Sequence, residues 1–352
     1  MSPKLKKVLM TLVQIGVTVG LLYWVFSNEQ RRHDVAAALG RAQWGWLIAA
    51  LVIFFSVFVG TGLRWLILVR VQGVKLGVGR ALALTFIGQF FSMFLPGATA
   101  GDVLKIFYVM KESPPEKKSA ALLSVLMDRL VGLMALVLIS GVTVALRYHW
   151  LLSGGEMARN IVWFFMGLMA AMFGGVTFSF AITMLGWVDK LPKWFPLRAK
   201  FVELAEAYNI YARAWPATLG AMGIGVAMHL MTFGAIHLAA HSIQAPITPA
   251  ETFSIMPIIG ALAAIPISPG GLGFREALYA NLMSPLTAVS QGDATTISLL
   301  NYTLYALMAT IGGVLFMIYR SSGQAPKAVD ALHEAQDTTA AEEEEIEARH
   351  QA

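Results

Sequence analysis

The sequence predicts an all-α integral membrane protein with about six transmembrane helices and two re-entrant helical hairpins arranged as an inverted-topology repeat. Two properties of the composition and one of its arrangement lead to this prediction. Of the 352 residues, 57% are hydrophobic and only 13% are charged. A soluble domain carries about 25% charged residues. The apolar residues form segments of about 20, the length of one bilayer crossing, and Lys and Arg gather in short groups beside them.

The chain begins with Lys4, Lys6 and Lys7, followed by an apolar run over 8–26. A signal peptide cleaved near 36–38 is the alternative interpretation. The run is longer than the usual hydrophobic region of about 7–15 residues in such peptides. We therefore expect a retained signal-anchor helix with its N-terminus in the cytoplasm.

Further segments are long enough to span the bilayer: 46–69, 120–146, 160–186, 217–241 and 297–319. Basic residues follow the second, fourth and last spans, whereas the loops 241–251 and 284–293 contain no Lys or Arg. Positively charged loops remain in the cytoplasm. We therefore expect a multi-pass protein of the cell inner membrane with both termini cytoplasmic.

Two shorter apolar pieces, 81–95 and 252–267, do not fit as crossings. Both flanks of the first are basic and both flanks of the second lack Lys and Arg, so each piece should return to the side from which it entered. Each would cover about 22–24 Å of a hydrocarbon core that is about 30 Å thick. The return segments are 101–111 and 273–283. Proline and glycine, which break helices and permit tight turns, mark the tips: Pro96, Gly97, Gly101, Pro269, Gly270, Gly271 and Gly273.

The order span, hairpin, span occurs in 46–146 and again, with every direction reversed, in 217–319. An inverted-topology repeat of this kind is typical of transporters. We assign 1–320 to one transmembrane domain, in which 196–215 forms an amphipathic helix at the cytoplasmic interface. The acidic tail 321–352 is expected to be disordered in the cytoplasm.

Ionisable side chains occur in the predicted membrane segments: Asp102, Lys105, Asp128, Arg129, Arg275 and Glu276. Each costs about 2.5–3.5 kcal/mol or more in the bilayer, so internal pairing is expected. Adjacent residues do not share a helix face, which favours pairs between the two halves. We predict that Asp102 or Asp128 pairs with Arg275, and that Glu276 pairs with Arg129 or Lys105.

Two interpretations of these pairs remain open. The pairs could lock hairpins to spans, because buried ion pairs often fix the register of packed elements. Alternatively, the carboxylates orient Arg129 and Arg275 toward a lipid phosphate, to which the planar guanidinium can donate two parallel hydrogen bonds. The N-terminal ends of the returning half-helices would favour the same anion.

Other polar residues of the spans have simpler explanations. Arg64 lies near the cytoplasmic end of its span and is expected to extend to the interface, with ligand contact as the alternative. Asn301 and Tyr305 share a helix face and either bond between helices or cap a cavity. His237 and His241 are four residues apart, but a third ligand is missing nearby, so we expect no metal site and no cofactor. The chain contains no cysteine and no catalytic motif that we recognise.

Three stretches, "FLPGATAGDVLKIFYVMK", "SVLMDRLVGLMALV" and "IPISPGGLGFREALY", resemble the lysylphosphatidylglycerol synthase transmembrane region, a family of flippase-like membrane proteins. The resemblance covers about 8–320. The family motifs fall on Gly101, Asp102, Lys105, Asp128, Arg129, Gly270, Gly271, Gly273, Arg275 and Glu276.

This resemblance implies a lipid flippase with membrane lipids as its partners, but not its substrate, because smaller members are linked to diverse lipids or glycolipids. From the charged residues we predict that it moves an anionic phospholipid or a lipid-linked head group. Basic residues grouped beside apolar segments favour topology control over nucleic-acid binding. Larger members carry a separate soluble synthase domain, which this sequence lacks. A lysyltransferase label would therefore be inherited from the family, and we expect no enzyme activity. A lipid-binding accessory role beside a partner enzyme, lipid modification and homo-oligomerisation stay open as alternatives.

Overall fold

The computed structural model describes residues 36–94, 100–112, 118–184, 202, 209–265 and 273–321. Within these ranges there is no strand, and five helices are long and apolar enough to cross a membrane. They are α3 (Trp44–Val71), α6 (Lys118–Leu151), α7 (Gly155–Met184), α9 (Trp215–Ser242) and α13 (Gln291–Ser321). All five coincide with predicted spans, so the all-α membrane class is confirmed. The predicted span 8–26, most of the interfacial helix 196–215 and nearly all of the tail 321–352 lie outside the described residues.

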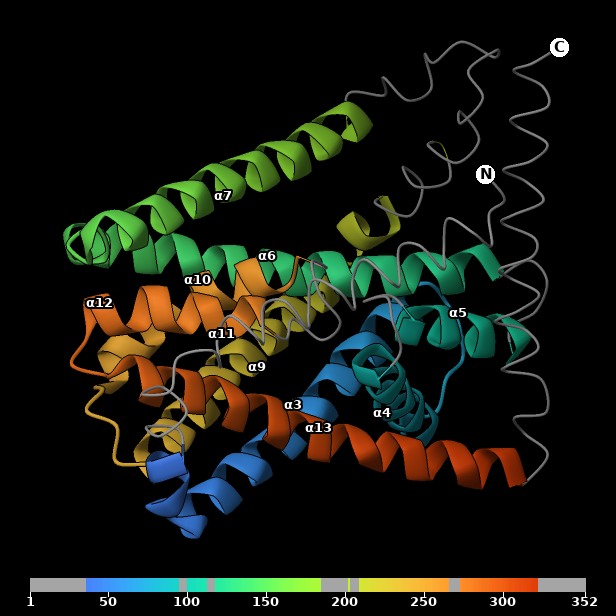
Figure 1. The fold of residues 1–352 in the computed structure, drawn as a ribbon. Helices are drawn as coiled ribbons and strands as arrows, with labels where there is room; N and C mark the ends of the chain where they lie inside the picture. The colour runs from blue at the N-terminus through green and yellow to red at the C-terminus, as the bar shows by residue number, and fades with distance from the viewer. Residues whose placement is uncertain are drawn as a thin grey trace, which may run out of the picture.

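Shorter helices occupy the predicted hairpin segments: α4 (Val78–Phe94), α5 (Ala100–Glu112), α10 (Pro249–Ala263), α11 (Phe274–Leu278) and the π-helix η3 (Tyr279–Met283). The short helix α12 (Ser284–Leu286) lies in the predicted loop 284–293. In Figure 1, α4 and α5 lie toward the right-hand end of α6 and α13, whereas α11 and α12 lie toward the left. Re-entry into the bilayer stays a prediction. Its tips, including Pro96, Gly97, Pro269, Gly270 and Gly271, lie outside the described residues.

Hydrogen bonds at the helix ends show which ends share a side. Arg41 Nε donates to the carbonyl oxygen of Ile243 over 2.7 Å, and the Arg41 guanidinium pairs with Asp293. These contacts join the start of α3, the end of α9 and the start of α13. At the other end, the Tyr211 hydroxyl donates to the carbonyl oxygen of Leu68 over 3.1 Å, and burial raises the pKa of Tyr211 above its ordinary value. The ends therefore group as the distribution of Lys and Arg predicts.

The contacts between helices have the same pattern in both halves. Helix α3 packs along α9; α3 contacts α4 and α6, as α9 contacts α10 and α13. Helix α4 packs on α13, and α10 packs on α6. Exchanging α3 with α9, α4 with α10 and α6 with α13 therefore reproduces the contacts among these six helices. An inverted-topology repeat of 46–146 and 217–319 requires this pattern.

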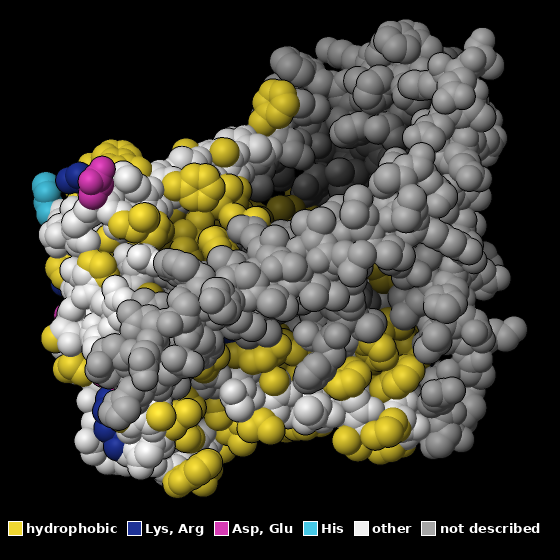
Figure 2. Space-filling view, in the orientation of Figure 1, with side chains coloured by type: hydrophobic (Ala, Val, Ile, Leu, Met, Phe, Trp, Pro, Cys, Tyr) yellow, Lys and Arg dark blue, Asp and Glu magenta, His cyan; other side chains and the backbone are white. Residues whose placement is uncertain are grey.

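Hydrophobic side chains cover much of the described surface in Figure 2, and charged side chains appear at its left-hand end. Helix α7 contributes several large exposed side chains, with Trp163 49%, Phe164 62% and Phe173 66% exposed. Patches of this kind are rare on soluble monomers but normal where a helix faces lipid. The distribution agrees with a belt of lipid-facing residues around the bundle.

Candidate functional site

Five ionisable side chains from three helices meet beside α4, and we call them the first charge cluster: Arg64 on α3, Asp102 and Lys105 on α5, and Asp128 and Arg129 on α6. Helix α5 reaches this position because its first turn crosses α4 with almost no space between the backbones. A Cβ atom at Gly101 would overlap the carbonyl oxygen of Gly88. Only glycine allows this close approach of two backbones.

The Arg129 guanidinium binds Asp102 in a two-pronged pair. Its Nε donates to Asp102 Oδ2 over 2.7 Å, and one terminal nitrogen donates to Oδ1 over 2.9 Å. The Arg129 side chain is 57% exposed, whereas that of Asp102 is 14% exposed. A pair with one exposed partner is worth about 0–1 kcal/mol. Arg129 can therefore exchange this carboxylate for another anion at small cost.

Arg64 does not extend to the interface, contrary to prediction. It is buried, and its Nε donates to the buried Asp128 Oδ1 over 2.8 Å. The guanidinium has room because two facing positions are glycines: a Cβ at Gly132 would lie 2.8 Å from one of its nitrogens, and one at Gly225 would lie 3.4 Å away. This pair lies inside the bundle and locks α3 to α6.

Lys105 is the most enclosed cation of the first charge cluster, slightly more so than Arg64. Only 6% of it is exposed, and its Nζ lies 4.7 Å from the centre of the Trp65 ring. Its aliphatic stem passes the position that a Cβ of Gly88 would fill, with Cε 3.3 Å away.

The second charge cluster consists of Arg275 and Glu276 on α11 with Ser298 and Tyr302 on α13. Glu276 is fully buried and already has two donors: the Gly273 amide at 2.5 Å and the Ser298 hydroxyl at 2.7 Å. Gly273 begins α11 with φ +81°, a conformation that side-chain-bearing residues rarely adopt. Glu276 therefore caps its own helix and ties it to α13.

The Arg275 guanidinium stacks on Tyr302, with Cζ 5.0 Å from the ring centre. Its Nε lies 3.8 Å from Glu276 Oε1, which is too far for a hydrogen bond. Within the described ranges, neither Nε nor one terminal nitrogen finds a hydrogen-bond acceptor, although the side chain is only 14% exposed. A buried guanidinium with unused donors can receive an anion.

The predicted pairing between halves is wrong. Asp102 pairs with Arg129 and Asp128 with Arg64, while Glu276 bonds to Ser298 and its own helix. The reason is packing: α5 lies on α6, and α11 lies on α13, so each carboxylate finds a donor within its own half. Helix spacing alone did not show which helix each carboxylate would face.

Tyr305 lies one turn beyond Tyr302 on α13. Its hydroxyl donates to Gln89 Oε1 on α4 over 2.9 Å. Asn301, one turn earlier, contacts the Tyr279 hydroxyl of η3 over 3.4 Å. The side chains that line this face of α13 follow helical spacing: Ser298, Asn301, Tyr302 and Tyr305.

The sequence did not predict Gln89, Ser298 or Tyr302 as residues of the site. The polar stripe on α13 was the available signal for two of them, because it repeats at three and four residues within an apolar helix. Gln89 carried no such signal, since its partner Tyr305 is 216 residues away.

The two histidines considered for a metal have other contacts. His237 Nδ1 lies 3.0 Å from the Thr252 hydroxyl, and His241 packs edge-on against Trp46. Within the described ranges, no group of three metal-binding side chains occurs.

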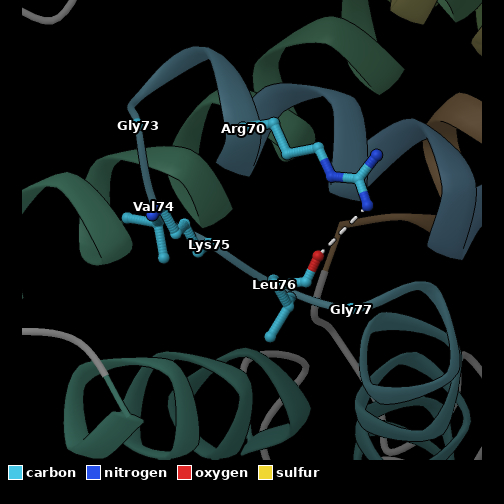
Figure 3. Close-up of a pocket in the computed structure, with 6 residues that line it drawn as sticks. All are labelled: Arg70, Gly73, Val74, Lys75, Leu76 and Gly77. Carbon is cyan, nitrogen blue, oxygen red and sulfur yellow. Dashed lines mark hydrogen bonds between the residues drawn. The ribbon is translucent and has the colours of Figure 1, made fainter.

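A surface pocket of about 540 Å³ lies at the end of α3, in the turn between α3 and α4. Figure 3 shows its lining, in which Arg70 reaches across the turn and donates to the carbonyl oxygen of Leu76 over 3.3 Å. Arg70 and Lys75 are exposed, and the remaining lining is apolar or glycine. This pocket is the inside of a turn that closes on itself, and we assign no site to it.

The comparisons with known proteins give one finding. A family model described as "Lysylphosphatidylglycerol synthase TM region" matches residues 11–313. A comparison with curated proteins gives no match.

Proposed function

Because the chain belongs to the lysylphosphatidylglycerol synthase transmembrane region family, we propose that it moves an anionic phospholipid or a lipid-linked head group across the membrane. Membership in this family indicates a membrane protein linked to lipid modification or lipid transport. Translocation is the more specific statement, and the following observations support it.

The unused donors of Arg275 carry the proposal. This guanidinium is mostly enclosed and stacked on Tyr302, and two of its nitrogens have no acceptor in the described part of the chain. A phosphate would accept two parallel hydrogen bonds from it and neutralise its charge. The enclosed Arg275 guanidinium is therefore suited to the phosphate of a lipid head group.

Arg129 would provide the second contact. It is the exposed partner of the Asp102 pair, so a second acceptor can reach its guanidinium. An arriving phosphate would replace Asp102 as the acceptor for Arg129, while the acyl chains remain in the bilayer. Asp102 then orients Arg129 before the lipid arrives. Asp128 and Glu276 hold the surrounding helices in place.

Translocation of a tail-labelled fluorescent phosphatidylglycerol in proteoliposomes tests the proposal. We expect Arg275→Gln and Arg129→Gln each to lower the initial rate at least tenfold, since a charge-assisted hydrogen bond is worth about 1.5–3 kcal/mol. The matched control is Arg159→Gln, because Arg159 is an exposed arginine of α7. Wild-type rates in both test variants would contradict the proposed role of the arginines.

The same vesicles distinguish the alternative functions. We propose that the lipid leaves chemically unchanged, so mass spectrometry should find no new head-group mass; a mass gain would indicate lipid modification. Deleting 321–352 should leave translocation intact, whereas an accessory protein would lose its partner instead. We also propose that the protein resides in the inner membrane with both termini cytoplasmic, as the Lys and Arg distribution predicts.

A further inference from the structure

Lys105 is buried in a way that its charged form tolerates poorly. It is 6% exposed, and its Nζ lies over the face of the Trp65 ring, 4.7 Å from the ring centre. An ammonium has three N–H donors, and holding its charge in an enclosed position beside a ring is costly. A ring face compensates for part of that cost, since a cation over an aromatic ring gains about 0.5–2 kcal/mol.

The charges around Lys105 do not balance. The first charge cluster holds three cations and two carboxylates, and both carboxylates are already taken, Asp128 by Arg64 and Asp102 by Arg129. The arginines keep their protons at any ordinary pH. Lysine is the cation whose charge the protein can remove, because a buried lysine readily loses its proton.

We propose that Lys105 is a proton-binding site, and that it takes up its proton when Arg129 leaves Asp102 for an anionic ligand. Asp102 and Lys105 are three residues apart on α5, so they share one face of the helix. When Arg129 turns to the ligand, Asp102 loses its partner, and the protonated Lys105 supplies the missing positive charge. When the ligand leaves, Arg129 returns and the proton is released.

Proton binding at Lys105 and anion binding at Arg129 are coupled in this proposal. A proton on Lys105 favours release of Arg129 from Asp102, and by linkage an anion on Arg129 favours the proton on Lys105. The proton site itself depends only on the contacts of Lys105. Its coupling to transport rests on the proposed function.

The titration of Lys105 must be distinguished from that of the other ionisable groups nearby. Arg64 on α3, and Asp128 and Arg129 on α6, are held in ion pairs, as is Asp102 on its own helix. Helix α4 contributes Arg80, which lies 5.5 Å from the ring centre of Tyr108 on α5. Helix α9 contributes His229, whose Nε2 lies 3.0 Å from the Gly132 carbonyl oxygen and which feels the charge of Arg64.

The proton site is tested by fluorine NMR of the full-length protein labelled with 5-fluorotryptophan. The chain has 9 tryptophans, and the resonance that disappears in Trp65→Phe belongs to Trp65. In the wild-type background this resonance should shift with a single titration over the pH range in which the protein stays folded, because the charge beside the ring changes. The shift should vanish in both Lys105→Arg and Lys105→Met and persist in His229→Gln, which is the matched control. A resonance that does not titrate in the wild type, or that still titrates in Lys105→Met, overturns the site.

The coupling is tested by lipid translocation at pH 6 and pH 8 in the vesicles described above. Wild-type rates should fall as the pH rises above the titration of Lys105, by up to tenfold per pH unit for one proton. The Lys105→Arg rate should not depend on pH, because arginine stays charged. An equal pH response in both proteins overturns the coupling. If the wild type moves no lipid at either pH, the proposed function fails, and the NMR titration still decides the proton site.

Discussion

Each charge cluster has a carboxylate near the start of a short helix, Asp102 on α5 and Glu276 on α11, but the two carboxylates have different partners. In the first charge cluster, Asp102 holds Arg129 in a two-pronged pair that is open on one side. In the second, Glu276 is fully buried and caps its own helix, which leaves donors of Arg275 without an acceptor in the described residues. Whether an arginine is paired therefore depends on what satisfies the nearby carboxylate. Asp102 accepts from Arg129, whereas Glu276 accepts from the Gly273 amide and from Ser298 on α13.

The largest effect on stability should come from the buried Arg64–Asp128 pair of the first charge cluster. Asp128→Ala leaves Arg64 charged and enclosed without its partner, and should lower the free energy of unfolding by about 3–5 kcal/mol. Unfolding in mixed micelles by SDS titration measures this loss. The double variant Arg64→Met with Asp128→Leu should recover most of it, because a well-packed apolar pair can replace a buried ion pair. A double variant no more stable than Asp128→Ala would show that the charges themselves are needed.

Glu276→Ala should give the next largest loss, about 2–3 kcal/mol, because it removes hydrogen bonds to a buried carboxylate. The same SDS titration measures it. Ser298→Ala removes one of these donors and should cost less. If Glu276→Ala were as stable as wild type, Glu276 would not lock α11 to α13, and its two hydrogen bonds would not stabilise the fold.

Backbone contact should also differ between the halves. Gly101→Ala forces a Cβ against the Gly88 carbonyl and should cost about 1–3 kcal/mol, the usual range for overpacking. Gly260→Ala is the matched control in the other half. Gly260 lies on α10, the helix that corresponds to α4, and a Cβ there meets nothing within 4 Å. This substitution should be neutral or stabilising by up to about 1 kcal/mol through helix propensity. Equal losses of stability at both positions would show that the α4–α5 contact is packed no more tightly than the surroundings of Gly260 on α10.

The smallest change in stability is expected for Asp102→Asn. Its partner Arg129 is more than half exposed, so the free energy of unfolding should fall by less than about 1 kcal/mol. Lipid translocation should change more than stability does, because Arg129 loses the group that orients it. A large loss of stability would place Asp102 with Asp128 and Glu276 as a residue that holds the fold.

The spans were predictable because length and hydrophobicity decide a bilayer crossing without reference to partners, and the five described spans matched. The side on which helix ends meet was also predictable, as the contacts of Arg41 show. The ion pairs were not. Arg64 and Asp128 are 64 residues apart, and the space for the guanidinium depends on two glycines from α6 and α9. Such space is a property of packed helices, and a single sequence does not display it.

The central claim is that Arg275 receives the anionic head group of a lipid. Native mass spectrometry of the purified protein tests it most directly, with the wild type compared with Arg275→Gln and with the control Arg159→Gln. The wild type and Arg159→Gln should retain a phosphate-bearing lipid, and Arg275→Gln should lose at least nine-tenths of it, since one lost charge-assisted contact lowers affinity about tenfold or more. Equal retention by all three proteins would contradict the claim and leave Arg275 as a residue that only packs against Tyr302.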